Sequence, residues 1–222
     1  MPSPGDTRRE RLSRARLYVV TGARQEQADL AGFLNEVLEA GADIIQMREK
    51  DAEAGDLLIW SREFRTAADR FGALFVVNDR PDVAVACGAD GVHLGQNDLP
   101  ASWARRMVGP DLLIGLSTHS IAEFDAGAMD ADYLCVGPLF ATPTKPGRPA
   151  TGLEIVRHAA SRERAGREER PWFAIGGVDT VSLPGVVEAG ATRIAVVRAV
   201  AGPAPGAAVS GLIEALSGSP VS

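Results

Sequence analysis

Short apolar runs alternate with longer amphipathic segments along most of the chain. The longer segments, such as 30–40, 57–71 and 153–165, place apolar residues at helical spacing. Gly41 and Gly72 stand where two of these helices are expected to end, because glycine readily adopts the backbone conformation found after a helix C-terminus. The apolar runs have the length of buried strands and occupy residues 17–20, 43–47, 74–77, 91–94, 112–116, 133–136, 172–175 and 193–197.

Eight continuous apolar strands, each followed by a helix-sized segment, predict an α/β fold with a single (β/α)8 TIM barrel. Parallel strands covered on both faces need no alternation of polar and apolar residues. A doubly wound open sheet is the alternative, but the Thr21-Gly22-Ala23-Arg24 turn lacks the glycine pattern of dinucleotide-binding folds. We expect residues 17–218 to form one barrel domain and the polar segment 1–16 to be a disordered leader.

Polar residues gather directly after several of these strands. In a barrel the carboxyl ends of the strands share one mouth, where the active sites of this fold lie. Singly, each group has a structural explanation, such as a helix N-cap at Asp98, but their repetition favours a shared pocket. The groups are Gln46, Arg48 and Lys50 after the second strand, Asn78, Asp79 and Arg80 after the third, His93, Gln96, Asn97 and Asp98 at the fourth, and Ser117 and His119 at the fifth.

These residue types suit a diphosphate. Arg48 and Lys50 supply cations, and Asn78 and Ser117 supply hydrogen-bond donors. The carboxylates at positions 79 and 98 are ligands that Mg²⁺ prefers, with water and substrate oxygens completing its shell. The sequence therefore predicts a diphosphate site with a bound divalent cation.

A polar loop follows the sixth strand and offers a further anion grip. Thr142, Thr144, Lys145 and Arg148 bring two hydroxyls and two cations together, while three prolines restrict the backbone. The alternative is a solvated surface turn. Near the end of the chain, Gly176-Gly177 and the Val197-Arg198 strand end occupy positions where many barrels bind phosphate, so we expect a second phosphate site there.

Composition narrows the possible partners. The chain has 222 residues, 45% of them apolar, and a net charge of −6 without a broad cationic face, so small molecules are expected rather than nucleic acid. No run approaches the roughly 18 apolar residues of a membrane span. Cys87 and Cys135 are expected to be buried thiols, and the location to be cytoplasmic. The oligomeric state stays open, a homo-oligomer included.

Six short motifs make the chain similar to the thiamine-phosphate synthase family. They stand in the family's order and cover the chain from about residue 17 to residue 200. Any one motif is weak evidence, but six in order resemble the family closely. They are Gln46-x-Arg48-x-Lys50, Asn78-Asp79-Arg80, His93-Leu94-Gly95-Gln96-x-Asp98, Ser117-x-His119, Gly137-Pro138-x-Phe140-x-Thr142-x-Thr144-Lys145 and Ala174-Ile175-Gly176-Gly177.

The resemblance implies a transferase that joins 4-amino-2-methyl-5-hydroxymethylpyrimidine diphosphate to a thiazole phosphate, giving thiamine phosphate and pyrophosphate. It also implies a dissociative mechanism, in which pyrophosphate leaves before the thiazole nitrogen traps a pyrimidine methylene cation. By the resemblance, the pyrimidine diphosphate contacts Gln46, Arg48, Lys50, Asn78, Ser117 and Lys145, Mg²⁺ binds Asp79 and Asp98, and the thiazole phosphate contacts Thr142, Thr144, Gly177, Val197 and Arg198. Of these, Arg48, Lys50, Ser117 and Lys145 are expected to act in catalysis.

One position departs from the family pattern, since Arg198 stands where the family usually has serine. The hydroxyl contact to the thiazole phosphate is lost with it, although a backbone amide remains. His93 and His119 are expected either to orient substrate and handle protons or to be structural. Two alternative functions stay open: a thiazole tautomerase of the same fold, and a non-catalytic barrel that binds thiamine precursors.

Overall fold

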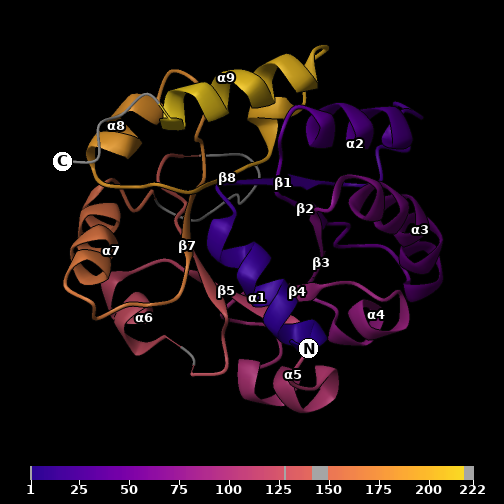
Figure 1. Ribbon diagram of the computed structural model, residues 1–222, viewed down its shortest axis with the longest axis horizontal. Helices are drawn as coiled ribbons and strands as arrows, with labels where there is room; N and C mark the ends of the chain where they lie inside the picture. The colour runs from indigo at the N-terminus through magenta and orange to yellow at the C-terminus, as the bar shows by residue number, and fades with distance from the viewer. Residues whose placement is uncertain (1, 128, 142–149, 218–222) are drawn as a thin grey trace.

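The parallel strands close on themselves in a computed structural model, which describes residues 2–127, 129–141 and 150–217. The strands follow one another in sequence order around the barrel, and β1 (Leu17–Thr21) pairs with both β2 (Ile44–Met47) and β8 (Ile194–Val196). Figure 1 shows the helices arranged around this ring of strands. The predicted (β/α)8 barrel is confirmed, and the open sheet is excluded because its first and last strands would not pair.

The remaining elements alternate as the sequence predicted, with small shifts at their ends. The other strands are β3 (Leu74–Asn78), β4 (Gly91–Leu94), β5 (Leu113–Thr118), β6 (Tyr133–Val136) and β7 (Trp172–Ile175). The helices are α1 (Pro4–Arg14), α2 (Leu30–Glu39), α3 (Ala54–Phe71), α4 (Pro81–Ala86), α5 (Ala101–Val108), α6 (Ile121–Ala126), α7 (Glu154–Arg164), α8 (Leu183–Glu188), the short 3₁₀ helix η1 (Arg198–Val200) and α9 (Pro205–Ser217). Gly72 ends α3 with φ of 69°, as its position predicted.

Alternate residues of the strands face opposite sides of the barrel wall. Outward residues such as Val19 join the large core between strands and helices. Inside, the rings of Tyr18, Tyr133 and Phe173 meet edge to face with centroids 5.5 to 6.0 Å apart. The inner cluster consists of Leu12, Ala15, Tyr18, Val20, Ile44, Leu74, Val76, Leu113, Tyr133, Cys135, Phe173 and Ala195. The barrel is therefore packed, and its chemistry is confined to the ends.

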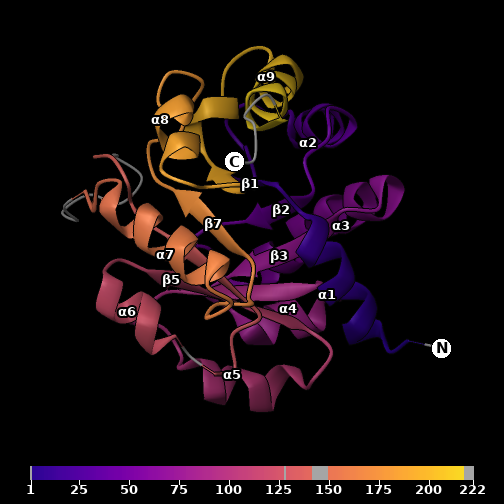
Figure 2. The same ribbon diagram turned by 60° about the vertical axis from the view of Figure 1, so that its left-hand side comes forward.

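The amino-terminal segment is a helix, so the predicted disordered leader is wrong for α1. Ser3 caps this helix: its Oγ accepts from the Asp6 N–H at 3.1 Å, and its own N–H donates to Asp6 Oδ2 at 3.0 Å. Leu12 is only 2% exposed because it packs into the inner cluster. As Figure 1 and Figure 2 show, α1 crosses the end of the barrel at which the strands begin.

Two carboxylates at the start of strands bind α1 to the barrel. Arg8 Nε donates to Asp90 Oδ1 at 2.9 Å, and Arg9 Nε donates to Asp132 Oδ1 at 2.8 Å. Asp90 also receives Arg65 Nη1 from α3 at 2.8 Å. This end of the molecule is held together by ion pairs and is separated from the mouth by the packed interior. None of the helices in the described ranges is long and apolar enough to cross a membrane.

Candidate active site

Two pockets adjoin at the carboxyl ends of the strands, and Ile175 and Val197 line both of them. The larger has a volume of about 350 Å³ and is called here the polar pocket; its lining residues are Tyr18, Val20, Gln46, Arg48, Lys50, Asn78, Asp79, His93, Gly95, Gln96, Asn97, Asp98, Ser117, His119, Cys135, Ile175 and Val197. The smaller, of about 280 Å³, is called the glycine pocket and is lined by Pro138, Ile175, Gly176, Gly177, Val178, Asp179, Ala195, Val196, Val197, Arg198 and Ala199.

The polar pocket brings together the predicted diphosphate and metal residues that the structure describes. Gln46 within β2 and Ser117 within β5 are 3% and 5% exposed, so they lie deep in the pocket. Arg48 and Lys50 follow the end of β2 and line its rim. Neutral hydrogen-bonding groups thus lie at the bottom of the pocket, and cations lie nearer to solvent, where they can bind a charged group such as a diphosphate.

Two carboxyl groups meet at this rim. Burial raises the pKa of Asp79, the hydrogen bond and charge of Asp98 raise it further, and Lys50 opposes the shift from 3.5 Å away. The φ of Asp79 is 62°, in the left-handed region that residues other than glycine rarely adopt. Its N–H donates to the His93 carbonyl at 2.8 Å, and Asp98 Oδ2 accepts from the Gly95 N–H at 2.7 Å. The backbone therefore holds the two carboxyls together despite their mutual repulsion.

This carboxyl pair fits a Mg²⁺ ion that shares its ligands with a substrate. Mg²⁺ in such sites typically takes one or two carboxylates, with phosphate oxygens and water as the other ligands. Within the described ranges, no group of three or more His, Cys, Asp or Glu side chains is placed to hold a metal ion. The donor set therefore suits a cation bound together with a diphosphate rather than a cation held by protein alone.

A line of buried hydrogen bonds runs beneath the polar pocket, from Gln46 to Ser117. Gln46 Nε2 donates to the Tyr18 hydroxyl, which lies 3.0 Å from the Tyr133 hydroxyl. The Tyr133 hydroxyl is 3.3 Å from His93 Nδ1, and His93 Nε2 is 2.9 Å from Ser117 Oγ. These five side chains, called here the buried relay, connect two opposite sides of the pocket.

His119 lies at the edge of the polar pocket and joins the ends of two strands. Its Nδ1 is 2.6 Å from the carbonyl oxygen of Gly137, so this nitrogen carries a hydrogen. Its backbone N–H donates to Glu123 Oε2 at 2.6 Å. These contacts support a structural role for His119, because they position the chain where it leaves β6.

The glycine pocket lies where β7 and β8 end. Gly177 has φ of 71°, and a Cβ there would come within 2.8 Å of Phe140 Cβ, so a larger residue would be strained and crowded. Gly176 is equally restricted, since its φ is 99° and an added Cβ would lie 2.5 Å from Pro138 Cα. The Phe140 N–H donates to the Gly176 carbonyl at 3.0 Å. The glycines thus let the chain after β6 pack directly against the end of β7.

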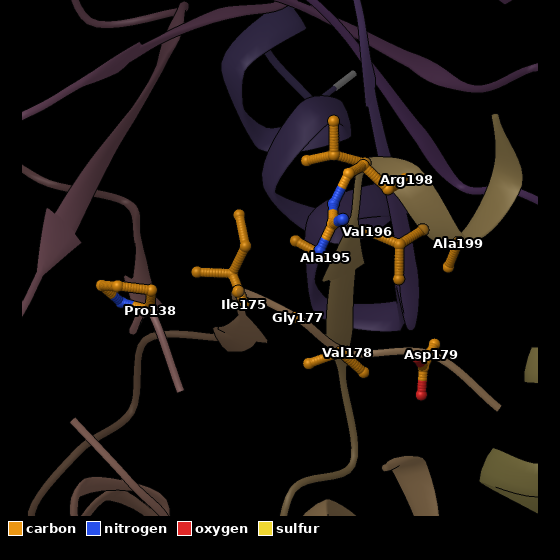
Figure 3. Close-up of a pocket in the computed structure, with 11 residues that line it drawn as sticks. Pro138, Ile175, Gly177, Val178, Asp179, Ala195, Val196, Arg198 and Ala199 are labelled. Atoms are coloured by element: carbon orange, nitrogen blue, oxygen red, sulfur yellow. The ribbon is translucent and has the colours of Figure 1, made fainter. Parts of the chain in front are cut away.

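Arg198 belongs to the glycine pocket, as predicted for a residue after the eighth strand. Figure 3 shows its side chain running from the end of β8 toward the other lining residues. Asp179 lies in the same lining, and its pKa is lowered mainly by the Ser182 N–H, with a smaller effect from the Arg198 charge. The pocket therefore combines glycine backbone with one cation beside one carboxylate.

Three predicted substrate contacts, Thr142, Thr144 and Lys145, lie outside the described residues. The described segments on either side of them are bonded to each other. The Thr151 N–H donates to the Pro138 carbonyl at 2.8 Å, and the Gly152 N–H donates to the Leu139 carbonyl at 3.1 Å. The segment before them also contacts the mouth, since Pro138 lines the glycine pocket.

Sequence reasoning missed Tyr18 and Tyr133 as parts of the site. Both lie within apolar strand runs, and their hydroxyls meet although 115 residues separate them in the chain. A tyrosine inside a buried strand is a usable signal, because its hydroxyl requires a partner. Asp179 was missed as well. Within the described chain, Cys87 and Cys135 are free thiols. Cys135 is buried as expected and lines the polar pocket, but Cys87 is only partly buried.

Comparison with known proteins gives one consistent family. A family model described as thiamine monophosphate synthase matches residues 17–200. A thiamine-phosphate synthase of Acidothermus cellulolyticus is 53% identical over 192 residues, covering 86% of this chain and 89% of that protein. One of Mycobacterium leprae is 51% identical over 224 residues, covering 93% of each.

One solved structure agrees with the sequence relatives. A thiamine phosphate pyrophosphorylase from Pyrococcus furiosus matches with a TM-score of 0.80 and 33% sequence identity, covering 94% of this chain and 97% of that chain. With a family model over most of its length and relatives that share half of its residues, the chain belongs to the thiamine monophosphate synthase family.

Proposed function

We propose that the chain is the transferase that condenses 4-amino-2-methyl-5-hydroxymethylpyrimidine diphosphate with a thiazole phosphate, releasing pyrophosphate and forming thiamine phosphate. The observation that carries this proposal is the pair of adjoining pockets with different chemistry, which share Ile175 and Val197 as a common wall. A condensation needs two substrates whose reacting atoms meet, and two pockets with a shared wall provide that arrangement.

The polar pocket takes the pyrimidine diphosphate. Gln46 lies deep enough to contact the ring, while Ser117, Asn78, Arg48 and Lys50 contact the diphosphate. From the sequence resemblance we add Lys145 to the diphosphate contacts. Arg48, Lys50, Lys145 and Ser117 are the catalytic candidates, because charge-assisted contacts strengthen as the leaving group gains negative charge.

The glycine pocket takes the thiazole phosphate. Backbone at Gly177 and Val197 and the Arg198 side chain line it, and Thr142 and Thr144 are added from the resemblance. An arginine can hold a phosphate through two parallel hydrogen bonds, which replaces the single hydroxyl contact that serine makes in the family. The thiazole ring then lies beside Ile175, with its nitrogen toward the polar pocket.

Bond breaking precedes bond making in the proposed mechanism. The C–O bond between the pyrimidine methylene and the diphosphate breaks first, and both bonding electrons leave with the pyrophosphate. The thiazole nitrogen then donates its lone pair to the methylene cation, which forms the C–N bond. Arg48 and Lys50 bind the departing diphosphate more tightly as its charge grows. They therefore lower the free energy of the transition state more than that of the bound substrates.

Asp79 and Asp98 are the residues that would hold Mg²⁺ beside the diphosphate. When bound there, the ion supplies charge neutralisation for the leaving group. Lys50 Nζ lies 3.5 Å from Asp79 Oδ2, so Lys50 would contact the diphosphate beside this carboxyl pair.

The decisive experiment incubates the protein with both substrates and Mg²⁺ and measures pyrophosphate release. Release that depends on both substrates supports the transferase. A thiazole tautomerase would convert the thiazole compound without the pyrimidine and would have little use for the carboxyl pair and the rim cations. Binding of both ligands without turnover would instead indicate a non-catalytic carrier. A cytoplasmic location and a possible homo-oligomer stay predictions from the sequence.

A further inference from the structure

The buried relay contains more hydrogen-bonding groups than substrate binding alone explains. Tyr18 and Tyr133 are fully buried, and His93 is 7% exposed. Burial raises the pKa of both tyrosines well above the ordinary value, so both hydroxyls carry their hydrogens at neutral pH. Each hydroxyl therefore has one hydrogen to donate, and an unsatisfied hydrogen at this depth would be costly.

These hydrogens can be placed in order along the relay. Gln46 donates to Tyr18, and the Tyr18 hydrogen then points to Tyr133, its other neighbour in the relay. The Tyr133 hydrogen in turn points to His93 Nδ1. If Tyr133 donated to Tyr18 instead, the Tyr18 hydrogen would lose its acceptor in the relay. One direction therefore satisfies every hydroxyl.

The same order determines the state of the histidine. Because Nδ1 accepts from Tyr133, the neutral imidazole of His93 carries its hydrogen on Nε2, which donates to Ser117 Oγ at 2.9 Å. Ser117 Oγ then acts as the acceptor in this contact. Its own hydroxyl hydrogen is left to donate into the polar pocket, which Ser117 lines.

We propose that Tyr133 is a positioning residue, which fixes the hydrogen of His93 on Nε2 and thereby turns the Ser117 hydroxyl hydrogen toward an anionic oxygen of the substrate. The kinetic part of this inference rests on the proposed function, since Ser117 is placed there at the pyrimidine diphosphate. Its structural part, the state of His93, does not. The relay also connects Ser117 to Gln46 on the opposite side of the pocket. The orientations of these two substrate-binding side chains therefore depend on the same chain of hydrogen bonds.

Gly115 in β5 leaves the space in which the Tyr133 hydroxyl contacts His93. His93, Gly115 and Tyr133 are direct neighbours across β4, β5 and β6 in the strand register. A Cβ at Gly115 would collide with the Tyr133 ring and hydroxyl and with His93 Nδ1. The φ of Gly115 is not in the left-handed region, so its backbone alone does not require glycine. The missing side chain is instead what allows Tyr133 to reach His93.

The first test measures the state of His93 directly in the wild-type protein without substrates. The chain has three histidines, so ¹⁵N NMR of histidine-labelled protein gives few signals, and the set lost in His93→Gln identifies the residue. At a pH where the imidazole is neutral, we expect a protonated Nε2 and an unprotonated Nδ1. A hydrogen on Nδ1 would overturn the proposal. This outcome does not depend on turnover, so it stands even if pyrophosphate release fails.

The second test asks whether Tyr133 acts through Ser117. We expect Tyr133→Phe to lower kcat about tenfold, as for loss of one oriented hydrogen bond, with little change in either KM. In a Ser117→Ala background the same substitution should cost less than about twofold, because the hydroxyl it orients is gone. Equal losses in both backgrounds would overturn the proposal.

Thr118→Val is the matched control. Like Tyr133→Phe, it removes a fully buried hydroxyl, in this case that of Thr118 in β5, which donates to the Cys135 carbonyl at 3.2 Å. The relay stays intact. We expect its kcat to stay within about twofold of wild type and its His93 signals to be unchanged. In Tyr133→Phe the His93 signals should shift toward a mixture of the two neutral forms, which a merely structural role of Tyr133 would not produce.

Discussion

Asp79 concentrates several unusual features in one residue. Its backbone lies in the left-handed region, and its carboxyl is held against that of Asp98 at a raised pKa. Both features are costly in the absence of a ligand, which is common where binding groups are positioned in advance. If the pair binds Mg²⁺ with the diphosphate, removing one negative charge should weaken the metal site while leaving the fold in place.

We expect Asp79→Asn to lower kcat by roughly a hundredfold or more, and a metal chelator to abolish wild-type activity. Asp82→Asn is a matched control, because Asp82 is a half-exposed residue of the next helix that pairs with Arg80. Steady-state kinetics with varied Mg²⁺ would check both variants. Full activity in chelator, or in Asp79→Asn, would show that the carboxyl pair has another role.

Arg198 stands where the sequence resemblance led us to expect serine, and its side chain lines the glycine pocket. A contact to a phosphate that does not react is equally strong in ground and transition states. Arg198→Ala should therefore raise the KM for the thiazole phosphate about tenfold with little change in kcat, and Arg198→Ser should recover part of the loss. Arg157→Ala, on the exposed face of α7, serves as control. An unchanged KM would assign the phosphate contact to the backbone.

The site residues that could be predicted from sequence are those whose position relative to a strand places them at the mouth of the barrel. Gln46, Asn78 and Ser117 could be predicted because each comes near the end of an apolar run. The contact between Tyr18 and Tyr133 could not, because it depends on strand register and on the space that Gly115 leaves. Register in a barrel is a property of the closed sheet, so a single strand does not reveal it.

At the scale of elements, α1 shows where sequence patterns lose their power. The helix is mostly polar, and within it Leu12 is the apolar side chain that is buried. Its partners Asp90 and Asp132 are 82 and 123 residues away from Arg8 and Arg9. A helix stabilised by such distant ion pairs has no strong apolar periodicity, and its composition therefore resembled that of a disordered leader.

The ion pair between Arg8 of α1 and Asp90 leads to a prediction about stability in acid. Burial alone raises the pKa of Asp90, but bonds from the Phe75 N–H, Arg65 and Arg8 outweigh it and hold the pKa below its ordinary value. A carboxyl with a lowered pKa in the folded state stabilises the fold above its unfolded pKa of about 3.9, and this contribution is lost as the pH falls through the folded value.

Asp90→Asn should therefore destabilise the protein by about 2 to 3 kcal/mol at neutral pH and by progressively less below about pH 4. Chemical denaturation at a series of pH values would measure this. Asp69→Asn, which also removes a carboxylate that pairs with Arg65 but is largely exposed, should cost less than about 1 kcal/mol. A difference between the variants that does not change with pH would contradict the assignment.

For the molecule as a whole, the alternation of strands and helices was predictable because buried parallel strands appear as continuous apolar runs. Closure of the barrel was predicted from the count of eight strands, and the β1–β8 pairing confirms it. The sequence predicted two groups of binding residues at the mouth but not the boundary between two pockets. That boundary is formed by Ile175 and Val197, whose apolar side chains carry no recognisable binding motif.

Separate pockets predict separate competition. Pyrophosphate should compete with the pyrimidine diphosphate, because both require the cations of the polar pocket, and inorganic phosphate should compete with the thiazole phosphate in the glycine pocket. Inhibition patterns with each substrate varied in turn would show this. In Arg198→Ala, inhibition by phosphate should weaken about tenfold while inhibition by pyrophosphate stays the same. Competition of phosphate with the pyrimidine substrate alone would contradict the assignment of the pockets.

Both ends of the described chain lie on the face of the barrel opposite the mouth. The chain enters through α1, and the end of α9 returns there, where Arg16 Nη2 donates to the Leu216 carbonyl at 2.6 Å. An affinity tag, a fused partner or a tether to a solid support added before α1 would therefore point away from the substrates. An immobilised form of this protein should face its reactants with an unobstructed mouth, whichever material carries it.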